Sequence, residues 1–350
     1  MNWIGLDAHQ SYCVAVVKND AGEVLRQDRI PSRVGDLEGY FREVGPEAEV
    51  AMEAGGSWPW IYDAIRPLVR RVALGHPLKI RLIGEARIKN DAIDAGKLSD
   101  LLRAGLLPEA YAAPASVRDA RQLTRSRVAL VHLRTGMKFR VRSLLRLQGL
   151  REPKGVRLFG PRGRSFLEAV ELPPHGREAL GGYVRVLDVL DVEIAKLDAR
   201  ILRLAEAEPA CTLLQTIPGI GVFSSALLVS EIGDVRRFAT AGKLCAWAGM
   251  VPSLYASGGV SRHGPITKQG NVWVRWVLCE CVTAAVRGAR RFRNLYERVR
   301  GRCGRSSARL AVAREMLTVA HAMLRSGEVF DAARAVPPPR KPPEAPASLA

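Results

Sequence analysis

The sequence predicts an α/β domain, then a basic helical connector, then a mainly α-helical C-terminal domain. Residues 3–84 alternate short apolar runs with turn residues, residues 116–205 show long helical periodicity, and residues 206–334 contain helical runs separated by glycine-rich loops. The length of 350 residues exceeds the usual size of one domain. We therefore expect three domains and a disordered tail rich in Pro and Ala, at 1–112, 113–205, 206–334 and 335–350.

The first domain opens with three strand-like runs, after which helices and strands alternate. Asn19-Asp20-Ala21-Gly22 has the composition of a hairpin turn, so the first runs are expected to form an antiparallel meander. This element order is compatible with a ribonuclease H-like fold. The expected strands are Trp3–Asp7, Tyr12–Val17, Glu23–Ile30, Glu49–Glu53 and Leu78–Gly84, and the expected helices are Val34–Val44 and Trp60–Val69.

The connector is helical and strongly basic. Apolar residues such as Leu130, Leu133 and Met137 recur at helical spacing, so one helix face can pair with another helix while the basic face meets phosphate. Pro153 and other breakers precede a second helical run, Tyr183–Leu204. We expect a helical hairpin, of the kind that forms coiled coils in self-association. The connector residues expected to contact nucleic acid are Arg125, Arg134 and Lys138.

Charge and cysteine usage narrow the classes of function. Fifty-three Lys and Arg against 35 Asp and Glu leave a net charge of +18, which favours a polyanionic partner, foremost nucleic acid. The charge is spread over several segments and no apolar run is long enough to span a bilayer, so a membrane partner is not expected. The six cysteines have no C-x-x-C spacing and predict neither a zinc site nor disulfides. Without a basic leader before Trp3, we expect a cytoplasmic protein.

Four carboxylates stand out in the first domain. Asp7 and Glu53 lie on expected strands, and Asp91 and Asp94 open a helix three residues apart, so both project from one helix face. Each alone is explained as a turn or cap residue. Together, in this order on such a sheet, they predict a site for Mg²⁺, with two ions about 4 Å apart for phosphodiester chemistry. Asp100 is expected on the solvated side of the helix.

The C-terminal domain is expected to contain two functional loops. Ile217-Pro218-Gly219-Ile220-Gly221 predicts either a helix-hairpin-helix element, with Gly219 and Gly221 near phosphate, or a plain helix-to-helix turn. Residues 249–270 form a glycine-rich basic loop in which Ser257 is either a reachable nucleophile or a turn former. Lys268 and Arg275 give it a phosphate-binding character. The expected helices are Ser224–Ile232, Ala241–Trp247, Asn271–Val286 and Ser306–Arg325.

These motifs, taken in order from Ile4 to Phe330, resemble those of the IS110 transposases. The matching segments are Ile4-Gly5-Leu6-Asp7, Glu53-Ala54, Lys89-Asn90-Asp91-Ala92-Ile93-Asp94-Ala95, Pro218-Gly219-Ile220-Gly221, Ser257-Gly258-Gly259, Ile266-Thr267-Lys268-Gln269-Gly270 and Trp273-Val274-Arg275-Trp276. Gly55, Trp58 and Ser99 depart from the commoner forms, where Thr, Tyr and Ala are usual.

The resemblance implies a RuvC-like domain whose DEDD tetrad, here Asp7, Glu53, Asp91 and Asp94, binds Mg²⁺. It implies that Ser257 is the nucleophile and forms a phosphoserine link to DNA. It further implies donor and target DNA as substrates, a structured bridge RNA as guide, and a homo-oligomer, dimer or tetramer, associated with the nucleoid.

Two other classes of protein would share part of this pattern. A Holliday-junction resolvase or nuclease would use four carboxylates and water, with no need for Ser257. An architectural DNA-binding protein would explain the positive charge and the Pro-Gly-Ile-Gly turn without any catalysis.

Overall fold

The computed structural model describes residues 1–83, 90–257 and 260–332, and the chain divides into two compact units, 1–113 and 114–350. In these described ranges no helix combines the length and the apolar character needed to cross a bilayer. The expected α/β N-terminal region and mainly helical C-terminal region are both confirmed. The expected tail at 335–350 lies outside the described residues, as do Lys89, Gly258 and Gly259 of the motifs.

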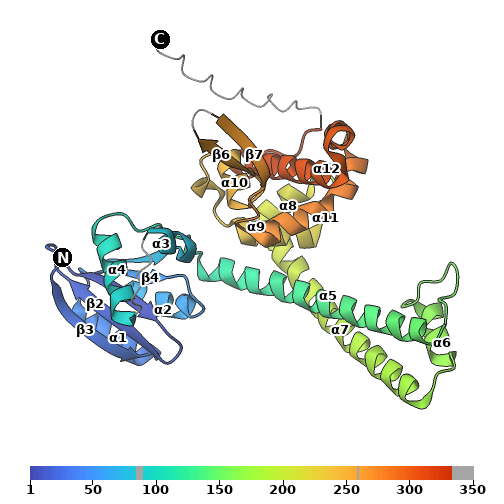
Figure 1. Ribbon diagram of the computed structural model, residues 1–350, viewed down its shortest axis with the longest axis horizontal. Coiled ribbons are helices and arrows are strands. Elements are labelled where there is room, and N and C mark those ends of the chain that lie inside the picture. Colours follow the sequence, from blue (N-terminus) through green and yellow to red (C-terminus); the bar gives the residue numbers. More distant parts are fainter. Residues whose placement is uncertain (84–89, 258–259, 333–350) are drawn as a thin grey trace, which may run out of the picture. The chain divides into compact units, whose positions relative to one another are not determined.

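The first unit is built on a five-stranded sheet in the order β3-β2-β1-β4-β5 (Figure 1). Strand β2 runs antiparallel to β1 and β3, whereas β1, β4 and β5 are parallel to one another. The elements are β1 (Trp3–Ala8), β2 (Tyr12–Lys18), β3 (Val24–Pro31), α1 (Val34–Val44), β4 (Glu49–Glu53), α2 (Trp58–Ile65), β5 (Arg71–Gly75), α3 (Pro77–Ile83) and α4 (Asp91–Arg103).

The last strand of this sheet was misplaced by the sequence pattern. A strand was expected at 78–84, but β5 occupies Arg71–Gly75 and residues 77–83 form helix α3. The apolar run of β5 is short and follows two arginines, so it was not recognised as a strand. Pro77, at the first position of α3, favours the start of a helix. Leu82, which suggested a buried strand, is exposed.

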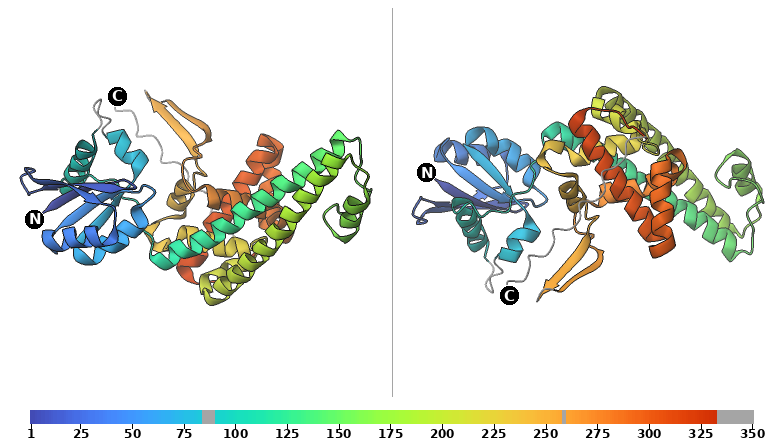
Figure 2. Two further views of the ribbon diagram at one scale, coloured as in Figure 1. Left: turned by 90° about the horizontal axis from the view of Figure 1, so that it is seen from below. Right: turned by 90° about the horizontal axis from the view of Figure 1, so that it is seen from above.

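Helices cover both faces of the sheet, as the edge-on view in Figure 2 shows. Alternate residues of β1, β2 and β4 pack with α1 and α2 into one core, which contains Leu6, Met52 and Phe41. The opposite face carries small residues, including Ala51, and is covered by α4 through Leu98 and Leu102. The packing of α4 on this face of the sheet brings the first turn of α4 close to the strands that carry Asp7 and Glu53.

The second unit combines a long helical hairpin with a compact helical body (Figures 1 and 2). Leu145 of α5 and Leu187 of α7 are buried together between the two arms of the hairpin. A second core joins α8 to α12. The elements are α5 (Ala115–Leu147), α6 (Pro161–Ala169), α7 (Pro174–Ala207), α8 (Pro209–Gln215), α9 (Val222–Ile232), α10 (Ala241–Trp247), β6 (Pro252–Ser257), β7 (Val260–Ile266), α11 (Val272–Gly288) and α12 (Arg290–Ser326).

Candidate active site

Asp7 and Glu53 stand near the ends of neighbouring parallel strands. In the register of β1 with β4, Leu6 pairs with Met52, and each acid follows one residue later. Side chains alternate between the two faces of a strand, and Leu6 and Met52 both belong to the core beneath α1 and α2. The two acids therefore belong to the face of the sheet that α4 covers.

Helix α4 approaches β1 closely because residue 5 is glycine. A Cβ on Gly5 would lie 1.7 Å from the carbonyl oxygen of Ala95, so no larger residue fits beneath the helix. The hydroxyl of Ser99 donates a hydrogen bond to the Trp3 carbonyl at 2.9 Å and fastens the same helix to the same strand. The first turn of α4, which begins at Asp91, is thereby held beside the end of β1.

A third attachment of α4 involves Asp100. Lys18 is buried on β2, and its Nζ lies 2.7 Å from Asp100 Oδ2 and 3.3 Å from the Gly96 carbonyl oxygen. Asp100 was expected on the solvated side, and its side chain is indeed 48% exposed while it ion-pairs with this buried lysine. The alternation along β2 places Lys18 on the α4 face together with Val16, whose partner Ala95 is buried.

Asp7, His9 and Asp91 meet at the end of the sheet. His9 Nε2 lies 3.1 Å from Asp7 Oδ2 and 3.4 Å from Asp91 Oδ2, and the ligand atoms of the three residues all lie within 4.8 Å of one another. The Tyr12 hydroxyl donates a hydrogen bond to Asp91 Oδ2 at 2.9 Å. Two elements far apart in sequence, β1 and α4, thus bring two of the four expected acids together.

The other two acids lie outside this close group. Asp94 has Lys97 Nζ 3.4 Å from its Oδ1, and Glu53 is exposed. Burial raises the pKa of Asp7, nearby His9 lowers it, and the negative charges of Asp91 and Asp94 raise it again. Asp94 has the weakest of these influences on Asp7, in keeping with its place outside the close group.

This donor set fits a divalent cation. Carboxylate oxygens are the ligands that Mg²⁺ prefers, and like-charged carboxylates at this separation favour a cation between them. In the described part of the chain, Asp7 and Asp91 pair with no Lys or Arg, and His9 is the basic group closest to both. Asp7 and Asp91 would hold such an ion directly, with Glu53 and Asp94 at the rim of the site.

His9 is absent from the residues predicted from sequence, although a signal for it exists. His9 follows the end of β1 directly and is two residues from Asp7, so the spacing in the sequence already places a metal-binding imidazole near the first acid. Tyr12 was missed as well. Its contact with Asp91 depends on the packing of α4 on β2, which no local pattern reveals.

Ser257 lies in the second unit, at the end of a strand. Residues 249–270 were expected to form a loop, but they contain the antiparallel strands β6 and β7. Ser257 pairs with Val260 as the last described pair of the hairpin, and its side chain lies outside the described part of the structure. Glycines, together with Pro252 in β6 and Pro265 in β7, interrupt the alternation of apolar and polar residues by which a strand is recognised in a sequence.

The segment after β7 is fixed against the end of α10. Gly270 has φ +134°, and a Cβ there would lie 2.1 Å from the Trp247 carbonyl oxygen. Arg275 Nη1 donates to the Ala248 carbonyl at 2.8 Å. Lys268 has φ +53° and is exposed, a backbone conformation that is strained for a lysine and is typical of functional segments.

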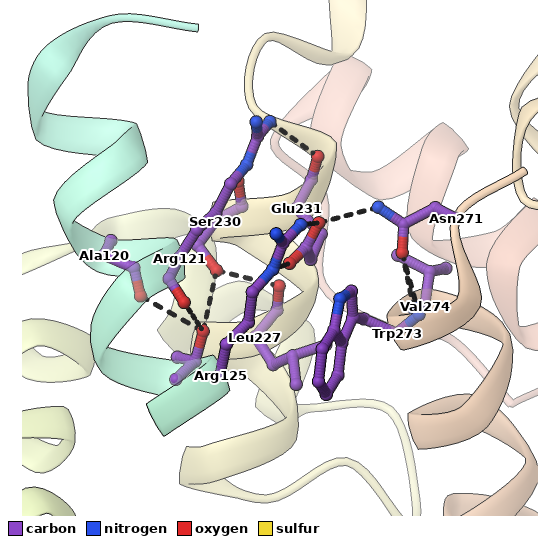
Figure 3. A network of polar contacts seen from close by, with 10 residues as sticks. Ala120, Arg121, Arg125, Leu227, Ser230, Glu231, Asn271, Trp273 and Val274 are labelled. Atoms are coloured by element: carbon purple, nitrogen blue, oxygen red, sulfur yellow. Dashed lines mark hydrogen bonds and ion pairs between the residues drawn. The ribbon is translucent and has the colours of Figure 1, made fainter. Parts of the chain in front are cut away.

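Asn271 connects this segment to a buried carboxylate (Figure 3). Its Oδ1 accepts hydrogen bonds from the first turn of α11, and its Nδ2 donates to Glu231 Oε2 at 2.6 Å. Arg125 of α5 binds Glu231 through two parallel contacts of 2.6 and 2.8 Å and lies over the ring of Trp273. Arg125 is thus bound to Glu231 while its side chain stays 40% exposed, and its expected contact with nucleic acid stays a prediction.

The other connector residues are also engaged within the hairpin. Arg134 Nη1 lies 3.0 Å from Asp191 Oδ1. Lys138 Nζ lies 5.3 Å from the centre of the Phe159 ring, and burial lowers its pKa. Their contact with nucleic acid stays a prediction, to which the structure adds Arg140 as an exposed neighbour on α5.

Gly219 and Gly221 lie between α8 and α9. Gly219 has φ +92°, and a Cβ there would lie 2.6 Å from the Cys281 carbonyl oxygen, so close packing on α11 accounts for this glycine. Gly221 precedes α9, and its amide donates to the Ser224 hydroxyl at 2.9 Å. A role of either glycine in phosphate binding stays a prediction.

Comparison with known proteins identifies the class of this protein. A transposase profile, that of the DEDD transposases of the IS110 type, matches residues 4–148, and the profile of the transposase IS116/IS110/IS902 family matches residues 211–297. A probable family 20 transposase of Pseudomonas aeruginosa is 30% identical over 81% of this chain and 84% of its own. The transposase for insertion sequence element IS1328 of Yersinia enterocolitica is 27% identical, over 83% and 87%. The protein is thus a DNA transposase.

The chain belongs to the IS110 family of transposases. The transposase for insertion sequence element IS1111A of Coxiella burnetii is also similar, at 27% identity over 68% of this chain and 66% of its own. The first profile covers the unit that holds Asp7 and Asp91, and the second covers the segment that holds Ser257. DNA is accordingly a partner of this protein.

Proposed function

We propose that this transposase cuts and rejoins DNA with a divalent metal site in a RuvC-like first domain and with Ser257 as nucleophile in its C-terminal domain. The observation that carries the proposal is the meeting of Asp7 and Asp91, from β1 and α4, at one end of the sheet. The strand order β3-β2-β1-β4-β5 with an antiparallel β2 supports the ribonuclease H-like assignment.

The four acids have distinct places in this proposal. Asp7 and Asp91 would bind the cation, for which Mg²⁺ is the expected ion, and Glu53 and Asp94 would complete the DEDD tetrad with a second ion. Bound Mg²⁺ supplies Lewis-acid stabilisation of the phosphodiester oxygens during an in-line displacement. Tyr12 fixes Asp91 by its hydrogen bond, so the carboxylate is oriented before DNA arrives.

Ser257 would form the covalent intermediate. Its Oγ attacks a phosphorus atom, a P–O bond to a deoxyribose oxygen breaks, and that oxygen leaves with a proton as a hydroxyl group. One phosphodiester replaces another, so rejoining by the reverse attack needs no ATP. A groove at the base of the hairpin, where Pro252 pairs with Ile266, supports phosphate binding in the same unit, because the exposed arginines Arg298 and Arg314 line it together with Arg275.

Guidance and assembly complete the proposal. A structured bridge RNA selects donor and target DNA, and a homo-oligomer, dimer or tetramer, brings acids and serine of different copies together. The exposed arginines of α5 and the net charge of +18 support a second nucleic-acid partner. Recovery of one discrete RNA with the purified protein is expected, and recovery of only heterogeneous fragments would contradict the guide.

The decisive experiment is a covalent-adduct assay with matched DNA, Mg²⁺ and RNA from the flanks of the element. A denaturant-resistant protein–DNA adduct is expected, and it should be lost in both Ser257→Ala and Asp7→Asn while DNA binding is retained. Ser253→Ala, four residues earlier on β6, is the matched control and should keep the adduct. Cleavage without any adduct would instead favour a resolvase or nuclease, and binding without cleavage would favour an architectural protein.

A further inference from the structure

We propose that His9 is a nitrogen ligand of the metal site and makes the site select Mn²⁺ over Mg²⁺. The inference rests on the proposed function, because it takes Asp7 and Asp91 as carboxylate ligands. It goes beyond the four-acid site, which consists of oxygen donors alone.

The position of the imidazole carries the first step. His9 Nε2 lies 3.1 Å from Asp7 Oδ2, within hydrogen-bonding distance, and 3.4 Å from Asp91 Oδ2, so the nitrogen is close to both carboxylates. An ion bound to both oxygens comes within reach of that nitrogen, because all three ligand atoms lie within 4.8 Å of one another. A histidine that served only to cap the turn would need no approach to Asp91, which comes from a different element.

The second step is that the imidazole is held in place. The His9 amide donates to the Tyr12 carbonyl at 2.9 Å, and the Ser32 hydroxyl donates to the His9 carbonyl at 2.9 Å. The His9 ring packs 4.8 Å from the Tyr12 ring, centre to centre. Since the Tyr12 hydroxyl also bonds Asp91, one side chain fixes both the nitrogen and the oxygen donor.

The third step is the chemistry of the donors. Mg²⁺ favours an all-oxygen shell of octahedral geometry and keeps several waters. Imidazole nitrogen is a better ligand for first-row transition ions than for Mg²⁺, and among those ions Mn²⁺ is the one that, like Mg²⁺, also suits carboxylate and water ligands. One nitrogen and two carboxylates at this site should therefore favour Mn²⁺, whose coordination geometry is otherwise close to that of Mg²⁺.

The test is the coordination of Mn²⁺ in the full-length protein, followed by electron spin echo spectroscopy. Bound Mn²⁺ is expected to show the ¹⁴N modulation of a coordinated imidazole, and His9→Asn is expected to remove it. His175→Asn, on the exposed first turn of α7, is the matched control and should leave the modulation unchanged. A wild-type protein that binds Mn²⁺ without ¹⁴N modulation would overturn the proposal.

Titrations of both ions give an independent readout without DNA. His9→Asn is expected to raise the Kd for Mn²⁺ by about 10-fold or more and the Kd for Mg²⁺ by less than about 3-fold, because only Mn²⁺ gains from the nitrogen. Equal changes for both ions would overturn the selection. If Asp7→Asn binds Mn²⁺ as tightly as wild type, the carboxylate site itself is wrong, an outcome distinct from failure of His9 alone.

Discussion

Glu231 and Asp7 are carboxylates with little exposure to solvent, one in each unit, and they differ in the charge of their neighbours. The Glu231 side chain, 1% exposed, receives two contacts from Arg125 and one from Asn271. Asp7 faces another carboxylate, Asp91, and in the described part of the chain no Lys or Arg pairs with either acid. The protein balances the charge of Glu231 with a permanent cation, Arg125, whereas Asp7 and Asp91 share only the imidazole of His9, so an external cation would complete the charge balance there.

The comparison distinguishes a structural acid from a functional one. A buried carboxylate with a complete set of partners joins helices α5, α9 and α11 and needs nothing else (Figure 3). The close packing of α4 on β1 keeps the carboxylates of Asp7 and Asp91 near each other, although their like charges repel. Such an arrangement is kept in a protein when it serves binding or catalysis, because it lowers stability.

The largest expected effect is at the structural acid. Arg125→Ala would leave Glu231 buried without its cation, so we expect the free energy of unfolding to fall by about 3 kcal/mol, measured by urea denaturation. Arg140→Ala, an exposed site on the same helix, should change it by less than about 0.5 kcal/mol. Equal effects of the two substitutions would show that the contacts between Arg125 and Glu231 do not contribute to the free energy of unfolding.

The next effect is at the contact that brings the functional acids together. Gly5→Ala would force α4 away from β1, because its Cβ would lie 1.7 Å from the Ala95 carbonyl oxygen. We expect a loss of about 2 kcal/mol in unfolding free energy and a loss of metal binding. Gly55→Ala, which has open space around it, serves as the control and should retain both. Normal metal affinity in Gly5→Ala would mean that the site does not depend on this approach.

The smallest effect, of opposite sign, is at the functional acid. The pKa of Asp7 is raised, chiefly by burial and further by Asp91, so the folded state disfavours the ionised form that prevails at neutral pH. We therefore expect Asp7→Asn to raise the free energy of unfolding by about 0.5 kcal/mol, measured by urea denaturation without metal. The same substitution should abolish strand cleavage when Mg²⁺ is present. A fall of more than about 1 kcal/mol would instead make Asp7 a structural residue.

Much of the helical architecture could be predicted from local patterns. The expected helix Ala241–Trp247 coincides with α10, and the expected break near Pro153 lies between α5 and α7. Periodicity and breakers act within one segment, so one sequence suffices to detect them. The strands β6 and β7 were missed because glycines and prolines obscure their alternation.

The candidate site could be predicted only in part, because its geometry depends on contacts between segments. The pattern identified Asp7 and Asp91 as candidates, and the structure brings them together. Their meeting depends on Gly5 and on the Lys18–Asp100 ion pair, which join residues about 80 to 90 positions apart in the chain. The ion pair of Asp100 with Lys18 could not be predicted for the same reason, although the Asp100 side chain is half exposed as expected.

The measurement that tests the central comparison most directly is the stability of the protein as Mg²⁺ is added. A cation bound between Asp7 and Asp91 stabilises the folded state, by about 1.4 kcal/mol when Mg²⁺ is ten times its Kd. We predict this gain in the wild type, in Arg125→Ala and in Asp36→Asn, an exposed acid of α1, and its absence in Asp7→Asn. An equal gain in Asp7→Asn would contradict the account, because Mg²⁺ would then be stabilising the protein from some other site.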